Sequence, residues 1–434
     1  MRASKIHFLS LDDTLKKKLL AWAQQYNEII WLDSNAHVHK YSRYEAILAV
    51  DAFTSVKTDQ FGAFDKLKEY QSITTDWIFG YLTYDLKNDV EKLSSNNFDG
   101  LDFPDLYFFQ PKKIFLFTHD SVELLYLNVV ADKMDSDWQE ILLTEIPEIS
   151  TSEKNQFKIC ERTTKKTYLK KVNQMLQHIN RGDIYEANLC QEFFSEFASI
   201  DPFAIFFHFN EISKAPFAAF LKLDHYFALS ASPERYLKKE GKNVISQPIK
   251  GTAKRHKTNT EDALTAKNLA EDPKERSENI MITDLVRNDL SRFAEKGSVN
   301  VDELCKVYTF EQVHQMISTI SCTISPQINS VEILRNTFPM GSMTGAPKIS
   351  AMQIIEELED SKRGLYSGAI GYFSPEADFD FNVVIRSILY NSNKKYISFS
   401  VGGAITASSI AENEYQECLL KANAMMKVLG ASFD

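Results

Sequence analysis

Two pairs of glutamates in the sequence have the spacing of metal ligands. Glu275 and Glu278 belong to K-E-R-S-E-N, and Glu414 and Glu417 belong to E-N-E-Y-Q-E-C-L-L-K. Residues three apart lie on one face of a helix, so each pair points in one direction. Two such pairs facing each other form a cluster that repels itself unless a divalent cation lies in it, and all-oxygen ligation suits Mg2+. A single helical E-x-x-E is usually a solvated face, so spacing alone leaves both interpretations open.

A lysine in an unusual sequence context indicates nucleophilic chemistry. Lys250 stands in Q-P-I-K-G-T, inside a strand-like run between a proline and a glycine. Partial burial of such a lysine removes hydration from the ammonium group, lowers its pKa and exposes a free amine. Glu234, in S-P-E-R, lies on the preceding strand of a predicted hairpin and can face Lys250 as a general acid or base. The alternative is an edge-strand lysine that discourages aggregation.

Two further features suit an anionic substrate. The segment F-P-M-G-S-M-T-G-A-P-K at 338–348 places glycine-rich backbone before a predicted helix, where anions bind readily. It lacks the G-x-x-x-x-G-K-[ST] pattern of a phosphate loop, which argues against a nucleotide. Arg386, in V-V-I-R-S, stands in an otherwise apolar predicted strand and needs a partner. A substrate carboxylate or an internal aspartate or glutamate would serve equally well.

Charge and composition limit the classes of partner. The chain of 434 residues has a formal net charge of -10, which argues against nucleic acid and requires local positive charge or a metal around any anionic substrate. Neither the apolar core of a signal peptide nor a membrane-length apolar run is present. Five scattered cysteines without C-x-x-C predict a reduced, cytoplasmic protein with neither a disulfide framework nor a zinc site.

The elements that must position these residues predict an α+β architecture. Residues 1–150 alternate strand-like runs with polar helical stretches, and the polar segment 149–158 is a predicted linker. Strands without regular βαβ alternation exclude a Rossmann sheet. The remaining predictions are a helix at 165–179, a strand–turn–strand unit at 224–252, a helical region at 260–293 interrupted by Pro273, strands at 368–374, 379–390 and 395–405, and a final helix at 411–429.

In their order along the chain, these segments resemble the chorismate-utilising enzymes, which include component I of anthranilate synthase, component I of aminodeoxychorismate synthase, and the isochorismate and salicylate synthases. The similarity is strong over residues 160–430 and weak over 1–150, where it rests on W-L-D-S and G-Y-L-T-Y-D-L. The motifs that carry it are G-D-I-Y-E-A-N-L, E-N-I-M-I-T-D-L-V-R-N-D-L, G-S-M-T-G-A-P-K, R-G-L-Y-S-G-A-I-G-Y, D-F-N-V-V-I-R-S and E-Y-Q-E-C-L-L-K-A.

The resemblance implies a fold and a set of roles. The fold is a large, mostly antiparallel β-sandwich flanked by helices in layers α/β/β/α, with a chorismate-binding catalytic region at 160–430. Glu278 and Glu417 resemble the family's Mg2+ ligands, with Glu275 and Glu414 close behind. The substrate-binding residues implied by matching motifs are His314, Thr344, Gly345, Tyr366, Arg386, Gly402, Gly403 and Lys421.

Lys250 separates the subfamilies. Q-P-I-K-G-T resembles component I of aminodeoxychorismate synthase, whereas anthranilate synthases typically have alanine at this position. The resemblance implies amination of chorismate to 4-amino-4-deoxychorismate through a covalent Lys250 intermediate, with Glu234 handling protons. Ammonia is expected from a separate glutamine amidotransferase subunit. The alternatives are component I of anthranilate synthase and a non-catalytic subunit that binds chorismate or tryptophan, for which Ser34 in W-L-D-S marks a site in residues 1–150.

Overall fold

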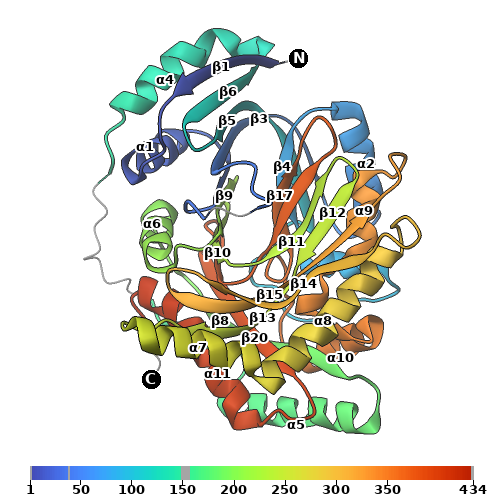
Figure 1. The fold of residues 1–434 in the computed structure, drawn as a ribbon. Helices are drawn as coiled ribbons and strands as arrows, with labels where there is room; N and C mark the ends of the chain where they lie inside the picture. Colours follow the sequence, from blue (N-terminus) through green and yellow to red (C-terminus); the bar gives the residue numbers. More distant parts are fainter. Residues whose placement is uncertain (1, 38–39, 148–156, 432–434) are drawn as a thin grey trace.

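The fold was derived from a computed structural model that describes residues 2–37, 40–147 and 157–431 (Figure 1). Within these residues the chain forms twenty strands and eleven α-helices, and all strand pairings in the sheet are antiparallel. None of the helices in these ranges is both long and apolar enough to cross a membrane. The fold is the expected α+β class.

The strands form two halves that share β5. The first half runs, in order of pairing, through β1 (Arg2–Phe8), β6 (Ser121–Leu127), β5 (Leu106–Phe117), β3 (Ala46–Thr58), β2 (Glu28–Asp33), β9 (Phe217–Leu223), β10 (Tyr226–Ser232), β19 (Ser387–Asn391), β20 (Tyr396–Ile405) and β8 (Glu186–Ser195). The short strands β7 (Cys160–Glu161) and β16 (Gly345–Ala346) also pair with β8.

The second half begins at the other end of β5. It runs through β4 (Ile78–Leu82), β17 (Ala369–Phe373), β18 (Phe379–Val383), β11 (Arg235–Glu240), β12 (Asn243–Gln247) and β15 (Val313–Thr323), which also pairs with β13 (Ile249–Lys254) and β14 (Asn300–Thr309). β5 pairs with β4 through 106–109 and with β6 through 113–117. One long strand therefore joins the two halves.

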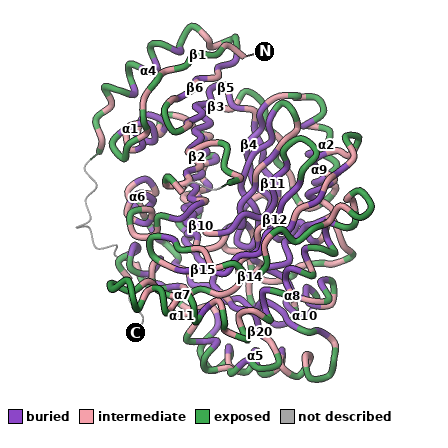
Figure 2. Tube along the Cα trace, in the orientation of Figure 1, coloured by how far each residue is buried: buried purple, intermediate pink, exposed green. Residues whose placement is uncertain are grey.

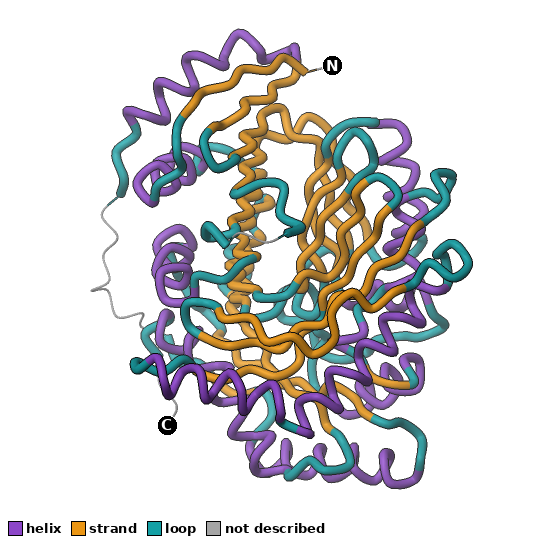
Figure 3. Tube along the Cα trace, in the orientation of Figure 1, coloured by secondary structure: helices purple, strands orange, loops and turns teal. Residues whose placement is uncertain are grey.

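Helices cover both outer faces, as the layered arrangement predicts (Figure 3). A core against the first half contains side chains of α1 (Asp13–Ala23), α4 (Met134–Leu143), α5 (Lys165–Arg181), α6 (Pro202–Ser213), α10 (Lys348–Leu358) and α11 (Ala411–Val428). A second core combines residues of both halves with α2 (Ala63–Thr74), α8 (Pro273–Ser291) and α9 (Ser330–Thr337). The buried residues follow the strands through the middle of the molecule (Figure 2).

Strand periodicity divides the side chains between the two cores. In β2, Ile29 and Trp31 pack into the helix-covered core, whereas Ile30 packs into the core that both halves share. Successive strand side chains point to opposite faces, so a strand buried on both sides has to be apolar throughout. This explains why many strands here read as continuous apolar runs rather than as alternating ones.

The predicted elements are confirmed except where the chain changes sheet. The interruption at Pro273 is confirmed, because Asp272 ends α7 (Asn259–Glu271) and caps α8 by accepting a bond from the Glu275 amide. The single strand predicted at 379–390 is wrong, since β18 and β19 lie in different halves. The region 224–252 forms four strands instead of two. The predicted linker at 149–158 lies mostly outside the described residues.

The N-terminal 150 residues contribute strands to both halves. β2 pairs with β9, and β4 pairs with β17, so in each half a block of strands from before the predicted linker joins a block from after it. Backbone hydrogen bonds of this kind tie the first 150 residues to the region that carries the motifs.

Candidate active site

The site lies where the chain crosses twice between the two halves of the sandwich. Glu234 stands between β10 and β11, and Arg386 stands between β18 and β19. The two crossings are joined by backbone bonds, in which the Val383 amide donates to the Glu234 carbonyl at 3.0 Å and the Ala231 amide donates to the Arg386 carbonyl at 3.0 Å. Arg386 has φ +50°, a left-handed conformation that is rare for a residue with a side chain. The crossings therefore bring a carboxyl group and a guanidinium group together from distant parts of the sequence.

Glu234 has the properties of a proton donor and acceptor near neutral pH. Its side chain is only 4% exposed. Burial raises its pKa to about 7, and the raising effect is opposed by the Ser342 hydroxyl and by the positive charge of Lys250. General acid–base catalysis is most effective when the pKa lies near the working pH. Glu234 can therefore both give up and take back a proton.

Lys250 is half-buried on β13 and faces a set of carboxylates. Its positive charge lowers the pKa of Glu234, Glu186, Glu278 and Glu417. The predicted proximity of Lys250 and Glu234 is thus present, but the two are not partners on one hairpin. Lys250 lies on β13, which pairs with β15, whereas Glu234 lies at the sheet crossing before β11.

The two glutamate pairs lie on α8 and α11, which converge at the site. The Lys274 ammonium bridges the two helices, at 3.8 Å from Glu278 Oε1 and 3.7 Å from Glu414 Oε1. Burial and the charge of Glu278 raise the pKa of Glu275, and burial raises the pKa of Glu278. The pKa of Glu417 is lowered instead, because Lys421, Lys274 and Lys250 together outweigh the effect of its burial.

This carboxylate cluster offers donors of the right chemistry for a hard divalent cation, although in the described residues they do not enclose an ion. Glu278 Oε1 is buried and has no hydrogen-bond partner among the described residues, and the Lys274 ammonium is its neighbour at 3.8 Å. The donors are all oxygens, which is the set that Mg2+ prefers. In the described part of the chain, however, no three acidic, histidine or cysteine side chains converge closely enough to enclose an ion. Lys274 supplies the compensating charge between the two helices.

Tyr366 and Arg386, the predicted clamp for a carboxylate, lie near each other in the structure. Burial lowers the pKa of the Arg386 guanidinium, and the nearby Glu417 carboxylate opposes this effect. Within the described residues no hydrogen bond or ion pair closer than 4 Å engages this guanidinium, so the internal partner allowed by the sequence is not found there. A buried guanidinium of this kind is well suited to bidentate binding of a carboxylate.

The glycines of β20 let neighbouring groups approach the backbone closely, since there is little or no space for a side chain. A Cβ on Gly403 would lie 3.3 Å from Glu414 Oε2 and 3.4 Å from Glu417 Oε1, and a Cβ on Gly402 would lie 2.4 Å from the Leu189 carbonyl oxygen. Lys421 donates to the Gly402 carbonyl at 2.8 Å and pairs with Glu417. The absence of side chains therefore allows β20 to pack closely on β8 at Gly402 and the carboxylates of α11 to lie beside Gly403.

Thr344 and Gly345 lie on the same side of the site, where the glycine-rich segment joins β8. The Thr344 carbonyl accepts from the Asn188 amide at 2.7 Å, and Gly345 pairs with Ala187 through β16. These bonds fix the segment beside Glu186, immediately before the start of α10 at Lys348.

His314 has both of its ring nitrogens occupied by protein groups. Nδ1 lies 2.9 Å from Thr309 Oγ1, and Nε2 lies 3.0 Å from Asp262 Oδ1 on α7. Asp262 also receives the Arg255 guanidinium. In this arrangement neither nitrogen is free to reach a substrate, and the substrate-binding role of His314 stays a prediction.

Two residues of the site were missed at the level of sequence. Glu186 is 1% exposed, and its Oε2 has no hydrogen-bond partner in the described ranges. Burial raises its pKa, while the charge of Lys250 lowers it. Glu186 is the first residue of β8 and belongs to the motif G-D-I-Y-E-A-N-L, and its place in that motif was the signal available in the sequence. Lys274 directly precedes Glu275, but nothing in the spacing marked it as the bridge between two helices.

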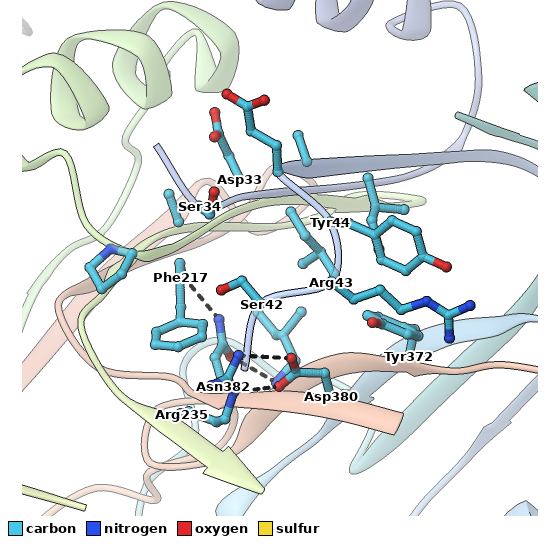
Figure 4. A pocket seen from close by; sticks show the side chains of 17 residues that line it. Asp33, Ser34, Ser42, Arg43, Tyr44, Phe217, Arg235, Tyr372, Asp380 and Asn382 are labelled. Atoms are coloured by element: carbon cyan, nitrogen blue, oxygen red, sulfur yellow. Dashed lines mark hydrogen bonds and ion pairs between the residues drawn. The ribbon is translucent and has the colours of Figure 1, made fainter. Parts of the chain in front are cut away.

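Ser34 lies apart from this site, on a pocket of its own (Figure 4). The pocket is bounded by residues of the N-terminal region, by Phe217 and by an ion pair in which Arg235 holds Asp380 at 2.9 Å. Arg235 directly follows Glu234 in the chain, so the pocket and the active site meet at one sheet crossing. Tyr44 and Tyr372 add aromatic surface to it.

Comparison with known proteins agrees with this geometry. Residues 20–427 match the family described as chorismate binding enzymes. Aminodeoxychorismate synthase component 1 of Bacillus subtilis is 33% identical over 81% of this chain and 77% of its own length. The same-named protein of Escherichia coli is 41% identical over 61% of this chain and 58% of its own length. Anthranilate synthase component 1 of Thermus thermophilus is 33% identical over 81% of this chain and 77% of its own.

Solved structures show the same fold. Anthranilate synthase component I of Streptococcus pneumoniae superimposes with a TM-score of 0.76 at 25% identity, covering 90% of this chain and 94% of that one. The menaquinone-specific isochorismate synthase of Escherichia coli, at 15% identity, shares the fold with a TM-score of 0.74. The predicted sandwich is thereby confirmed, and the chain belongs to the family of chorismate binding enzymes.

Proposed function

We propose that this enzyme aminates chorismate at the ring carbon that bears the hydroxyl, giving 4-amino-4-deoxychorismate for the 4-aminobenzoate and folate pathway. The observation that carries the proposal is the half-buried Lys250 beside the buried Glu234, whose pKa is about 7. An amine nucleophile and a carboxyl group that is protonated half of the time near neutral pH are the two groups that a covalent substitution needs.

The reaction divides one difficult substitution into two easier ones. The Lys250 amine forms a bond to the ring while Glu234 gives its proton to the 4-hydroxyl, which leaves as water. Ammonia then forms the new carbon–nitrogen bond as the bond to Lys250 breaks, and Lys250 leaves as a free amine. The enolpyruvyl group stays on the ring. Tyr366 and Arg386 hold its carboxylate, which gives the otherwise unpaired guanidinium its partner.

Glu278 and Glu417 would hold Mg2+, with Glu275 and Glu414 behind them. The ion would neutralise the substrate's ring carboxylate, which otherwise meets four glutamates and a chain with a net charge of -10. Gly402 and Gly403 leave room for backbone to approach the substrate, and Lys421 keeps Glu417 in its ionised form by lowering its pKa.

The product identifies the function. Purified protein should be incubated with chorismate, Mg2+ and an ammonium salt, and the products should be separated by chromatography and identified by mass spectrometry. Aminodeoxychorismate supports the proposal. Formation of fluorescent anthranilate with release of pyruvate would instead assign anthranilate synthase activity. This alternative is considered because the relatives from Thermus thermophilus and Streptococcus pneumoniae are named as anthranilate synthases. Binding of chorismate without turnover would assign a non-catalytic subunit.

A separate glutamine amidotransferase is the proposed source of ammonia. The family region at 20–427 takes up most of the chain, and several relatives are named as a component 1. We expect glutamine to replace the ammonium salt only when such a subunit is added. Glutamine-dependent turnover by the purified chain alone would contradict this.

The Ser34 pocket is proposed to bind an aromatic amino acid such as tryptophan. Its wall combines aromatic surface with the Arg235–Asp380 pair and the Ser34 hydroxyl, which suits a zwitterion with a ring. Calorimetric titration with tryptophan tests this, and Ser34→Ala should weaken binding about tenfold, the effect of one lost hydrogen bond to a charged group. Equal affinity in both proteins would remove Ser34 from the site.

A further inference from the structure

A small, largely buried pocket, called the cavity below, is lined by Glu234. Glu234, Ser246, Asp289, Thr337, Gly341 and Ser342 supply its polar wall. The volume in which the centre of a water molecule can lie is about 10 Å3. One water molecule requires roughly 10–15 Å3 measured in this way, so the cavity has the size for a single water and for little else.

Two oxygen atoms on this wall are buried and lack partners. Asp289 Oδ1 and Ser342 Oγ make no hydrogen bond within the described ranges, and their residues are 2% and 5% exposed. The other carboxylate oxygen of Asp289 accepts from the buried Lys348 ammonium. The Ser342 hydroxyl lies near enough to Glu234 to lower its pKa, although the two do not reach the geometry of a direct hydrogen bond.

Such an arrangement is unfavourable unless a ligand completes it. A buried polar group without a partner costs about 1–3 kcal/mol, and buried waters typically make about three hydrogen bonds to groups of this kind. We propose that this cavity binds one water molecule, held by Asp289 Oδ1 and Ser342 Oγ beside the Glu234 carboxyl group, and that this water relays protons to Glu234 from the side of α8.

The relay rests on the proposed function, and its purpose follows from the proton balance. Glu234 gives one proton to the departing hydroxyl, which leaves as water. The new amine is an ordinary alkylamine and leaves as an ammonium ion at neutral pH, keeping the proton that would otherwise return to Glu234. The net reaction consumes chorismate, ammonia and one proton, and that proton must come from solvent.

The water provides a route to a side chain that solvent barely touches. Glu234 is 4% exposed, and substrate would cover it on the side of Lys250. The charged groups that face the cavity and its wall are Lys250 on β13, Asp289 and Arg292 at the end of α8, and Lys348 on α10. Burial raises the pKa of Asp289, which favours the passage of a proton through this carboxyl group, and Arg292 next to it is exposed to solvent.

The kinetic test removes the hydroxyl that binds the water. We expect Ser342→Ala to lower kcat about tenfold or more, with an unchanged KM for chorismate and an increased solvent isotope effect. The apparent pKa on the alkaline limb should rise, because the Ser342 hydroxyl lowers the pKa of Glu234. Ser374→Ala is the control. It removes a buried hydroxyl that follows the end of β17 and does not line the cavity, and it should leave all four quantities unchanged. An unaltered kcat in Ser342→Ala overturns the relay. An effect confined to the KM for ammonium assigns the cavity to ammonia and also overturns it.

The structural test does not depend on the reaction. A high-resolution crystal structure of the protein should contain one water within hydrogen-bond distance of Asp289 Oδ1 and Ser342 Oγ, and the Ser342→Ala structure should have lost or displaced it. A dry cavity in the wild-type protein overturns the proposal even if the enzyme aminates chorismate. Conversely, an ordered water in a protein that makes anthranilate would overturn the proposed function and leave the water site standing.

Discussion

The active site has two parts that handle charge in opposite ways. We call them the helical half, which is the glutamates of α8 and α11, and the strand half, which is Lys250 and Glu234; they are distinct from the two halves of the sandwich. The glutamates of α8 and α11 form a dense anionic cluster that is balanced by Lys274 and Lys421. The Lys250–Glu234 half is embedded among strands, where burial brings the pKa of the carboxyl group to about 7. The helical half therefore balances its carboxylates with ammonium groups, whereas the strand half holds a group that changes charge easily. Binding of a divalent cation needs carboxylates such as those of the helical half, and proton transfer needs a group with a pKa near the working pH.

The difference also separates the effects of mutations. A change in the strand half should act on the chemical step, because its groups handle the bonds that form and break. A change in the helical half should act first on the metal requirement and on substrate binding. Each prediction below either separates the two halves or shows that they act as one unit.

The largest effect is expected from Lys250→Ala. Removing the nucleophile should lower ammonia-dependent formation of aminodeoxychorismate by about 10³-fold or more, with the Mg2+ dependence of any residual rate unchanged. Product formation measured by liquid chromatography checks this. Lys254→Ala, an exposed lysine on the same strand, is the matched control and should retain full activity. Unchanged product formation in Lys250→Ala would contradict the covalent step.

Glu234→Gln should be the next most damaging change. The amide cannot donate an acidic proton, so we expect kcat to fall by roughly 10²-fold or more. In the wild type the acid form is lost as pH rises through about 7, so kcat should decline on the alkaline side, and this decline should disappear in the variant. Rates measured from pH 5.5 to 9, a range of about two units around that pKa, test this. Glu240→Gln, exposed at the end of β11, is the control.

Glu417→Gln should change the metal requirement more than the chemistry. Loss of one ligand is expected to raise the Mg2+ concentration for half-maximal activity by roughly 10–100-fold, while excess Mg2+ restores much of the rate. Glu412→Gln, exposed at the start of the same helix, should titrate like the wild type. A wild-type Mg2+ titration in Glu417→Gln would remove this residue from the ligand set. A loss that excess metal cannot restore would show that the two halves are not separable.

Glu186→Gln should have the smallest effect of the four. Its buried carboxylate faces Lys250, and the amide keeps its shape without its charge. We expect a decrease in kcat of about tenfold, the effect of one charged hydrogen bond, and little change in the Mg2+ dependence. Glu196→Gln, exposed just beyond the end of β8, is the control. Altered Mg2+ dependence instead of altered kcat would move Glu186 to the helical half.

The sequence predicted the helical half of the site better than the strand half, and the reason is the difference between helix and strand geometry. Glu275, Glu278, Glu414 and Glu417 could be grouped in advance because the helix has a fixed period and α8 is delimited by the Asp272 cap and Pro273. The strand half could not. Lys250 and Glu234 were expected on one hairpin. Instead, Lys250 lies on β13, which pairs with β15, and Glu234 directly precedes β11, which pairs with β18. Strand pairing has no local period that reveals which strands will meet.

By itself, the sequence determined the α+β class, the helical carboxylate pairs and the order of the family's motifs, because these depend on local spacing and composition. The tertiary structure alone decided that the chain crosses between sheets at Glu234 and again at Arg386, which leaves one carboxyl group near pKa 7 and one guanidinium without an internal partner within the described residues. It also decided that Lys274 joins α8 to α11 and that Asp262 and Thr309 occupy His314. Burial and charge proximity arise from contacts between residues far apart in the chain, and no local pattern fixes them.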